Sequence, residues 1–142
     1  MTEVCEDHKL EELEIGQKRE FSLKITESLV NEFAKTSGDY NPLHMDKQYA
    51  QSTNFGKRVC HGMLLGALFS KMVGMYLPGK NALYFSQTLN FRLPCFINDT
   101  VIVEGEIMER SLASRIITLR TSIYNEDRKC LVDGIAKVIV RQ

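Results

Sequence analysis

The chain lacks the features that mark several large classes of protein. It has no net charge, because 18 lysine and arginine residues balance 18 aspartate and glutamate residues. Balanced charge creates no field that attracts nucleic acid or an anionic membrane surface, so we expect no nucleic-acid partner. The longest apolar stretch, residues 63–77, is interrupted by Gly66, Ser70, Lys71 and Gly74 and is shorter than the roughly 20 residues that span a bilayer. We therefore expect no membrane span.

Paired cysteines and targeting signals are missing as well. The four cysteines, at positions 5, 60, 95 and 130, are scattered singly and include no C-x-x-C pair. This spacing favours reduced thiols over a disulfide set. Residues 1–16 form an acidic N-terminal segment without the apolar core of a signal peptide or the arginine-rich pattern of a transit peptide. We accordingly expect a cytoplasmic location.

Recognised cofactor and metal patterns are also absent. No G-x-G-x-x-G or P-loop string occurs, so we expect no nucleotide cofactor. Asp39, His44, Cys60 and His61 are suitable metal ligands by type, but their spacing fits neither a zinc finger nor an H-E-x-x-H helix. We expect no metal.

The most informative segment that is present is residues 37–45, with the sequence S-G-D-Y-N-P-L-H-M. It places Asp39 and His44 five positions apart on a stretch that Gly38 and Pro42 should keep out of ordinary helix or strand. A histidine titrates near neutral pH, and a neighbouring carboxylate can orient its ring and share proton transfer. The pair is suited to acid/base chemistry on a bound water, although Asp and Asn beside Pro also compose ordinary turns.

A longer string gives this pair a context. Residues 33–46 read F-A-K-T-S-G-D-Y-N-P-L-H-M-D and are followed by Ala50. The string closely resembles the signature of the (R)-specific enoyl-CoA hydratases, the MaoC-like hydratase 2 group of the hot-dog fold. Thr36 departs from the aliphatic residue more usual there. A second block, V-C-H-G-M-L-L at residues 59–65, resembles the start of that family's central helix.

The hydrophobic pattern predicts a helix-rich first half and a strand-rich second half. We expect a strand over 17–25, a helix that Thr26 caps and Gly38 ends, a short helix over 47–51 capped by Asp46, and a long helix over about 62–77. Four later runs, 82–91, 100–108, 115–124 and 129–141, are rich in β-forming residues. Their connections are too short for crossover helices, so neighbouring strands should be antiparallel.

These elements predict an α+β fold in which a twisted antiparallel sheet wraps one long central helix. The length of 142 residues fits a single domain, 1–142. The resemblance implies the same architecture, a MaoC-like hot-dog domain.

The start of the long helix is a second candidate site. Gly62 falls in the first helical turn, where its N–H has no intrahelical acceptor and the helix dipole adds positive character. Such a group can stabilise an oxyanion, and in the resembled family the matching glycine donates to the thioester carbonyl. Gly62, Gly66, Ser70 and Gly74 recur at every fourth position. This stripe of small residues along one face of the helix indicates close contact with the sheet, an acyl pocket at Gly66 and Ser70, or both. His61 could cap the helix, shape the substrate site or simply precede the helix.

The resemblance implies a reversible addition of water to trans-2-enoyl-CoA that gives the (3R)-3-hydroxyacyl thioester. Asp39 and His44 would activate the water, Gly62 would hold the thioester oxygen, and Asn41 would orient the loop and the carboxylate. No cofactor is implied beyond the CoA carried by the substrate, and a homodimer is expected because the open sheet leaves an edge strand to cover. A hot-dog acyl-CoA thioesterase and a non-catalytic acyl-thioester binding module are the alternatives. The division of acid and base roles within the pair, and the choice of CoA or acyl carrier protein as carrier, stay open.

Overall fold

The computed structural model describes residues 3–142, and its main layer is a six-stranded antiparallel sheet. The strands are β1 (Lys18–Lys24), β2 (Ala82–Gln87), β3 (Asn90–Phe91), β4 (Thr100–Arg110), β5 (Ile116–Tyr124) and β6 (Cys130–Val140). Their order is β1-β4-β5-β6-β2, with β3 also paired to β6. Every pair in this sheet is antiparallel, as the short connections predicted.

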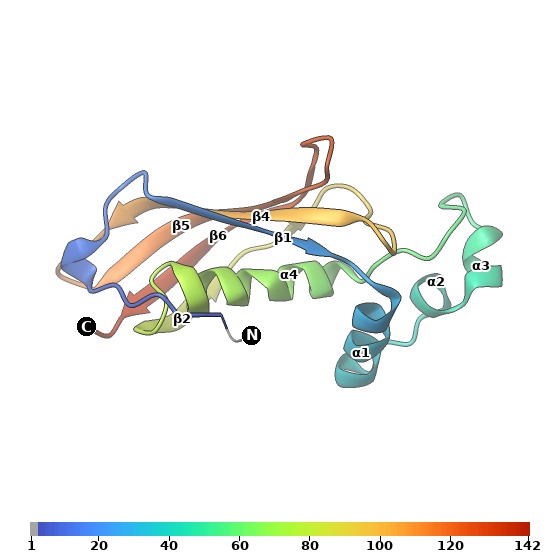
Figure 1. The fold of residues 1–142 in the computed structure, drawn as a ribbon, viewed down its shortest axis with the longest axis horizontal. Helices are drawn as coiled ribbons and strands as arrows, with labels where there is room; N and C mark the ends of the chain where they lie inside the picture. Colours follow the sequence, from blue (N-terminus) through green and yellow to red (C-terminus); the bar gives the residue numbers. More distant parts are fainter. Residues whose placement is uncertain (1–2) are drawn as a thin grey trace.

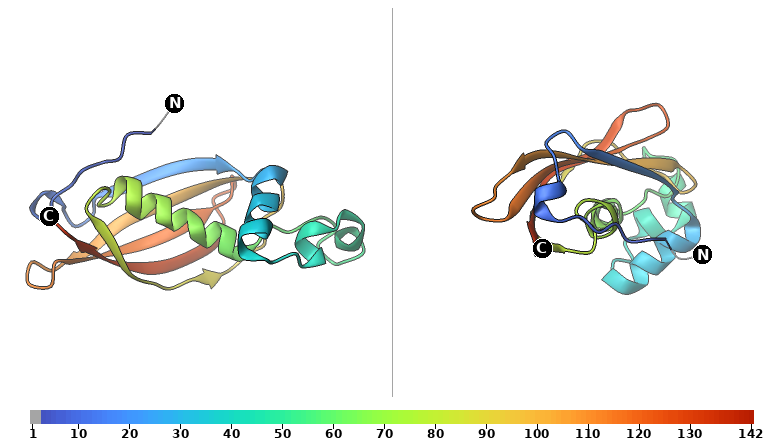
Figure 2. Two further views of the ribbon diagram at one scale, coloured as in Figure 1. Left: turned by 90° about the horizontal axis from the view of Figure 1, so that it is seen from below. Right: turned by 60° about the vertical axis from the view of Figure 1, so that its left-hand side comes forward.

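The long helix lies across the concave face of this sheet (Figures 1 and 2). It consists of α4 (Gly62–Lys71) and continues as a π-helix over Met72–Tyr76. Leu65, Phe69 and Met72 are buried against strand residues in the core. The predicted arrangement of one central helix wrapped by a twisted sheet is confirmed. Among residues 3–142 we find no helix with the length and apolar character needed to cross a membrane.

Three short helices gather beyond one end of the sheet (Figure 1). They are α1 (Glu27–Ser37), α2 (Pro42–Met45) and α3 (Lys47–Gln51). The Thr26 side chain accepts from the Leu29 N–H at the start of α1, and Gly38 ends it with φ 81°. Such a cap stabilises a helix by about 1 kcal/mol. Both ends of α1 and the Asp46 cap of α3 therefore confirm the prediction.

The prediction that residues 37–45 avoid helix was wrong in part. Pro42 occupies the first turn of α2, where its missing N–H would have no acceptor in any case. The Asn41 side chain accepts from the Leu43 N–H and caps this helix. His44 therefore projects from one tight turn of helix whose start Pro42 fixes.

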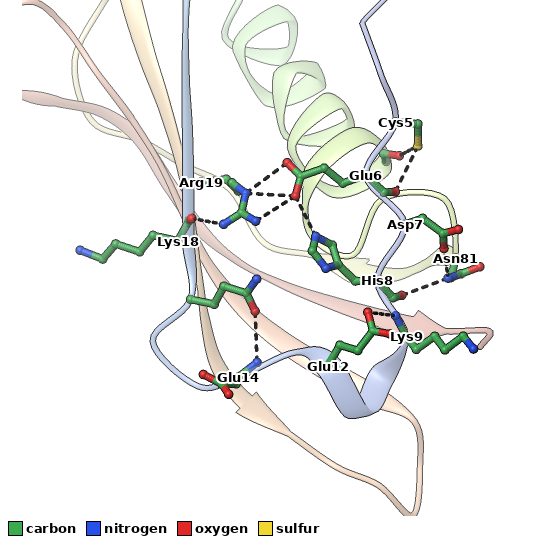
Figure 3. Close-up of polar contacts among 12 residues, drawn as sticks. Cys5, Glu6, Asp7, His8, Lys9, Glu12, Glu14, Lys18, Arg19 and Asn81 are labelled. Atoms are coloured by element: carbon green, nitrogen blue, oxygen red, sulfur yellow. Dashed lines mark hydrogen bonds and ion pairs between the residues drawn. The ribbon is translucent and has the colours of Figure 1, made fainter.

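The acidic N-terminal segment contributes to the core. Leu10 and Leu13 are fully buried beside the C-terminal half of the long helix, around the 3-10 helix Leu10–Glu12. Glu6 receives hydrogen bonds from Arg19 and pairs with His8 at 2.7 Å, which fastens the segment to β1 (Figure 3). The segment is thus tied to the sheet by both apolar and polar contacts.

The predicted strand over 82–91 is interrupted. It divides into β2 and β3 at residues 88–89, where the Ile135 N–H donates to the Thr88 hydroxyl and the Thr88 carbonyl lies so close to Gly134 that no side chain would fit there. The irregular residues 88–89 bring the Leu89 side chain against α4, where a Cβ on Gly66 would lie 3.0 Å from Leu89 Cδ1. This interruption shapes one wall of the region described next.

Candidate active site

Asp39 is held on three sides by the residues around it. Its N–H donates to Ser37 Oγ at 3.1 Å, and its Oδ1 accepts from the Asn41 N–H at 3.1 Å. Its carbonyl oxygen accepts from His61 Nε2 at 2.9 Å. These bonds leave Oδ2 directed at His44, and the side chain is 48% exposed, so a small molecule can reach it.

His44 is also held in place by hydrogen bonds to the surrounding protein. Its ring Nδ1 donates to the Val59 carbonyl at 2.7 Å, and its own carbonyl accepts from Arg58 Nε. Because a carbonyl oxygen only accepts, Nδ1 carries the proton, and Nε2 of the neutral ring presents a lone pair. Arg58 also bonds to Glu27 and Asn31, which ties α2 to α1. The ring orientation and tautomer of His44 are therefore both set by the protein.

The two free atoms of this pair face each other across a gap. Asp39 Oδ2 and His44 Nε2 lie 4.0 Å apart, which is too long for a direct hydrogen bond. Both atoms are acceptors in the carboxylate and neutral imidazole forms, so a water molecule between them can donate one hydrogen to each. The structure brings the predicted pair together in a form that can bind water.

Gly62 borders the same cavity as the pair. The cavity has a volume of about 480 Å³, and its wall includes Asp39, His44, Gly62, Phe91 and Leu65. Gly62 is the first residue of α4, so its N–H has no acceptor within the helix. A Cβ on this residue would lie 2.9 Å from the Phe91 ring. The absence of a side chain at position 62 lets the Phe91 ring pack directly on the backbone at the wall of the cavity.

His61 plays a part that its position in the sequence did not reveal. It occupies the N-cap position of α4 without a side-chain cap, so its predicted place just before the helix is confirmed and the capping role is wrong. Its ring reaches back to Asp39 and stacks on His44, with the ring centroids 4.1 Å apart. Burial lowers the pKa of His61, and the neighbouring His44 lowers it further, whereas the bond to the Asp39 carbonyl opposes this.

Asp39, His44 and His61 are also close enough together to be considered as metal ligands. However, His44 Nδ1 and His61 Nε2 are already committed to carbonyl oxygens. The two rings are stacked with only 30° between their planes, so their remaining in-plane lone pairs do not converge on one point. The arrangement suits a bound water better than a metal ion.

Cys60 lines the cavity beside the pair. A hydrogen bond with Cys95, together with burial, raises the pKa of the Cys60 thiol far above its ordinary value. Since the thiolate is the nucleophilic form of cysteine, this residue is not equipped to attack a thioester.

The other predicted residues occupy separate places. The Asn41 side chain caps α2, and it is the backbone N–H of this residue, not its side chain, that holds the Asp39 carboxylate. Gly66 and Ser70 line a second apolar recess of about 480 Å³, between α1, α4 and β2, rather than the cavity of the pair. Met63 borders both spaces and is the residue they share.

Several contributors could not be recognised in the sequence. Val59 acts only through its backbone carbonyl, which any residue could supply. Arg58 resembled an ordinary surface charge, yet its side chain is only 12% exposed. The one available signal was the V-C-H-G string itself, which placed Val59 and His61 within three positions of Gly62.

Comparison with known proteins gives this geometry a family. The profile of the MaoC like domain matches residues 11–126. The chain is 41% identical over 126 residues to an (R)-specific enoyl-CoA hydratase of Aeromonas caviae, covering 89% of this chain and 94% of the relative. It is 35% identical over 133 residues to the enzyme of the same name from Rhodospirillum rubrum, covering 94% and 92%.

A solved structure shows the same fold. An R-hydratase from Pseudomonas aeruginosa in the unliganded form superposes with a TM-score of 0.93 at 38% identity, covering 97% of this chain and 88% of that one. The range that the family profile matches, residues 11–126, includes the loop of the pair and the start of α4. The chain therefore belongs to the MaoC-like dehydratase domain family.

Proposed function

We propose that the protein is an (R)-specific enoyl-CoA hydratase that interconverts trans-2-enoyl-CoA and (3R)-3-hydroxyacyl-CoA. The observation that carries this proposal is the 4.0 Å gap between Asp39 Oδ2 and His44 Nε2 in a cavity that Gly62 also borders. Two relatives that match 89% and 94% of this chain are enzymes named for this reaction.

The pair acts on one water molecule. Asp39 Oδ2 and His44 Nε2 each accept one hydrogen of the water, which turns a lone pair of its oxygen toward C3 of the enoyl group. As the O–C3 bond forms, the pair takes one proton from the water and returns a proton to C2. Both new bonds are made from the side on which the pair lies. The two groups act together, so acid and base roles belong to the pair.

Gly62 stabilises the charge that develops during this addition. Electrons pushed from C3 toward the thioester carbonyl place negative charge on its oxygen. The N–H of Gly62 donates to that oxygen, and the N-terminal end of α4 adds positive character at the same place. One well-placed donor of this kind is worth about 10² to 10³ in rate.

The acyl chain extends toward the recess at Gly66 and Ser70. Met63 borders both this recess and the cavity of the pair, so a longer chain can pass along α4 from one to the other. Leu89 partly fills the space beside Gly66. Asn41 orients the site by capping the helix that carries His44.

We also propose that two copies of the chain associate through β2. The two edges of the sheet differ: β1 carries Lys18, Arg19, Glu20 and Lys24, whereas β2 exposes apolar side chains, with Leu83 at 54% and Phe85 at 62%. Charged edges resist pairing, and exposed apolar edges favour it. Joining β2 to its copy would cover this edge and close the neighbouring recess. Residence in the cytoplasm stays a prediction.

Crotonyl-CoA tests the function. The purified protein should remove the absorbance of the conjugated enoyl thioester without releasing free thiol, and chiral analysis should find (3R)-3-hydroxybutyryl-CoA. Release of CoA at the same rate as substrate loss would identify a thioesterase. Binding without turnover would leave a non-catalytic acyl-thioester module.

A further inference from the structure

His61 is buried, but its contacts distinguish it from a residue that only fills the core. Its side chain leaves α4 and packs between three groups of the site region: the Asp39 carbonyl at 2.9 Å, the His44 ring at 4.1 Å between centroids, and the Phe33 ring at 5.0 Å. The residue is only 2% exposed. One imidazole thus touches both members of the water-binding pair.

The tautomer of His61 follows from its partners. The Asp39 carbonyl can only accept, so the hydrogen lies on Nε2. Nδ1 is then an unprotonated nitrogen, and within residues 3–142 this buried atom has no hydrogen-bond partner. A proton on Nδ1 would be buried without an acceptor, which is costly. The surroundings therefore hold the ring neutral, in the Nε2–H form.

The net effect of burial and nearby groups is to lower the pKa of His61. Burial is the largest influence and lowers it, the Asp39 carbonyl and carboxylate raise it, and the charges of His44 and Arg58 lower it. A neutral ring can lie against His44 while that residue exchanges a proton, whereas a charged ring would repel the imidazolium that forms. Neutrality of His61 is thus compatible with the work of its neighbour.

We propose that His61 is a positioning residue whose Nε2–H holds the Asp39 backbone while its ring face supports the His44 imidazole, so that the gap receiving the water is kept at its working width. This inference rests on the proposed function for its kinetic consequences, but its geometry can be tested without turnover. His61 links α4, which supplies the Gly62 N–H, to the loop that supplies Asp39. The same side chain therefore sets the water-binding pair relative to the oxyanion donor.

Two variants separate this role from simple filling of the core. His61→Phe retains an aromatic ring against His44 and Phe33 but has no donor for the Asp39 carbonyl. His61→Gln retains an N–H donor at a similar reach but loses the ring. If His61 only filled space, Phe would be the better substitute; if the hydrogen bond positions Asp39, Gln would be better.

The kinetic experiment measures kcat and KM for crotonyl-CoA, together with thermal unfolding, for the wild type and both variants. We expect His61→Phe to lower kcat by roughly 10- to 100-fold with KM within about twofold, because a displacement of about 1 Å at a reacting group costs up to about 10²-fold. We expect His61→Gln to recover at least about fivefold of that loss, even if its melting temperature is lower. The proposal would be overturned if kcat changed in parallel with the melting temperature and the kcat of His61→Phe equalled or exceeded that of His61→Gln.

Ring nitrogen NMR provides the readout that does not need activity. In protein labelled with ¹⁵N in the histidine rings, His61 should show a neutral ring with its proton on Nε2 at about pH 7, and the His44 signals should shift in His61→Phe. A proton on His61 Nδ1, or His44 signals that the substitution leaves unchanged, would contradict the inference. A wild type with the expected ring signals but no hydratase activity would reject the proposed function and leave the positioning role of His61 standing.

Discussion

Asp39 Oδ2 and His44 Nε2 face each other 4.0 Å apart. The N–H, carbonyl and Oδ1 of Asp39 and the Nδ1 of His44 are hydrogen-bonded to the surrounding protein. This division between fixed and free atoms is what gives the pair a single use. The bonded atoms fix position and tautomer, and the two free acceptors fit one water molecule.

The first prediction concerns the interdependence of this pair. Asp39→Asn and His44→Ala should each lower kcat for crotonyl-CoA by roughly 10² to 10⁴, the usual contribution of a positioned acid or base. Because both residues bind one water, the double variant should lose little more than the more impaired single variant. Losses that add in free energy would show that the two residues act separately. Circular dichroism spectra like that of the wild type would confirm that the variants are folded.

The second prediction concerns acyl chain length. Gly66→Val places a branched side chain where a Cβ already lies 3.0 Å from Leu89 Cδ1, in the recess assigned to the chain. We expect KM to rise for dodecenoyl-CoA far more than for crotonyl-CoA. Overpacking costs typically about 1–3 kcal/mol, so a lower melting temperature is expected as well. An equal loss of activity on substrates of every chain length would show that the stripe of small residues at positions 62, 66, 70 and 74 serves only packing.

The third prediction concerns assembly. Phe85→Glu places a charge on the exposed edge of β2 and should shift the sedimentation mass from dimer to monomer. Leu112→Glu is the matched control, because Leu112 is 62% exposed, as is Phe85, but lies in the turn between β4 and β5. The control should retain the wild-type mass. A monomeric wild type, or an equal effect of both substitutions, would reject β2 as the contact.

The fourth prediction concerns Cys60. Its raised pKa means that little thiolate forms near neutral pH, so Cys60→Ala should keep kcat within a few-fold of the wild type. The loss of a buried sulfur should lower stability by about 1 kcal/mol. In the native protein, a thiol reagent should modify the partly exposed Cys5 and Cys130 before Cys60. Abolished turnover in a folded Cys60→Ala protein would show instead that the thiol is needed for activity.

The fifth prediction concerns stability in acid. The folded protein depresses the pKa of His61, whereas the unfolded chain should show the ordinary value of about 6.5. Above that pH the His61 ring is neutral in both the folded and the unfolded state, so His61 contributes no pH dependence to the free energy of unfolding. As the pH falls below about 6.5, the unfolded state takes up the proton first, so the free energy of unfolding decreases until the pH passes the folded value. Urea titrations should show a smaller decrease for His61→Phe, and identical decreases would contradict the lowered pKa.

The parts of the fold that were predictable are those determined by neighbours in the sequence. Thr26, Gly38 and Asp46 mark helix ends through local hydrogen bonds and backbone conformation, and the structure confirms each. Alternation and β-branched residues likewise placed the strands to within a few residues. The helix α2 was missed because Pro42 was read as a helix breaker, although proline is well tolerated in a first turn.

The features that escaped prediction depend on distant parts of the chain. Where residues 82–91 divide into β2 and β3, Thr88 lies against Gly134 of the neighbouring strand β6, more than 40 positions away in the sequence. The link from His61 to Asp39 joins residues 22 positions apart, and no local pattern encodes it. The proximity of Asp39 and His44 was predictable because both residues lie in one short string, whereas the groups that hold them in place could be identified only from the structure.

The stereochemical course of hydration in deuterium oxide tests most directly whether one pair acts on one water. In the proposed mechanism Asp39 and His44 supply both the water and the proton from one side of the cavity, so hydroxyl and deuterium should add to the same face of crotonyl-CoA. NMR of the product should then show a single diastereomer with 3R configuration and deuterium at C2 syn to the new oxygen. An anti product, a mixture of diastereomers at C2 or a 3S alcohol would contradict the account.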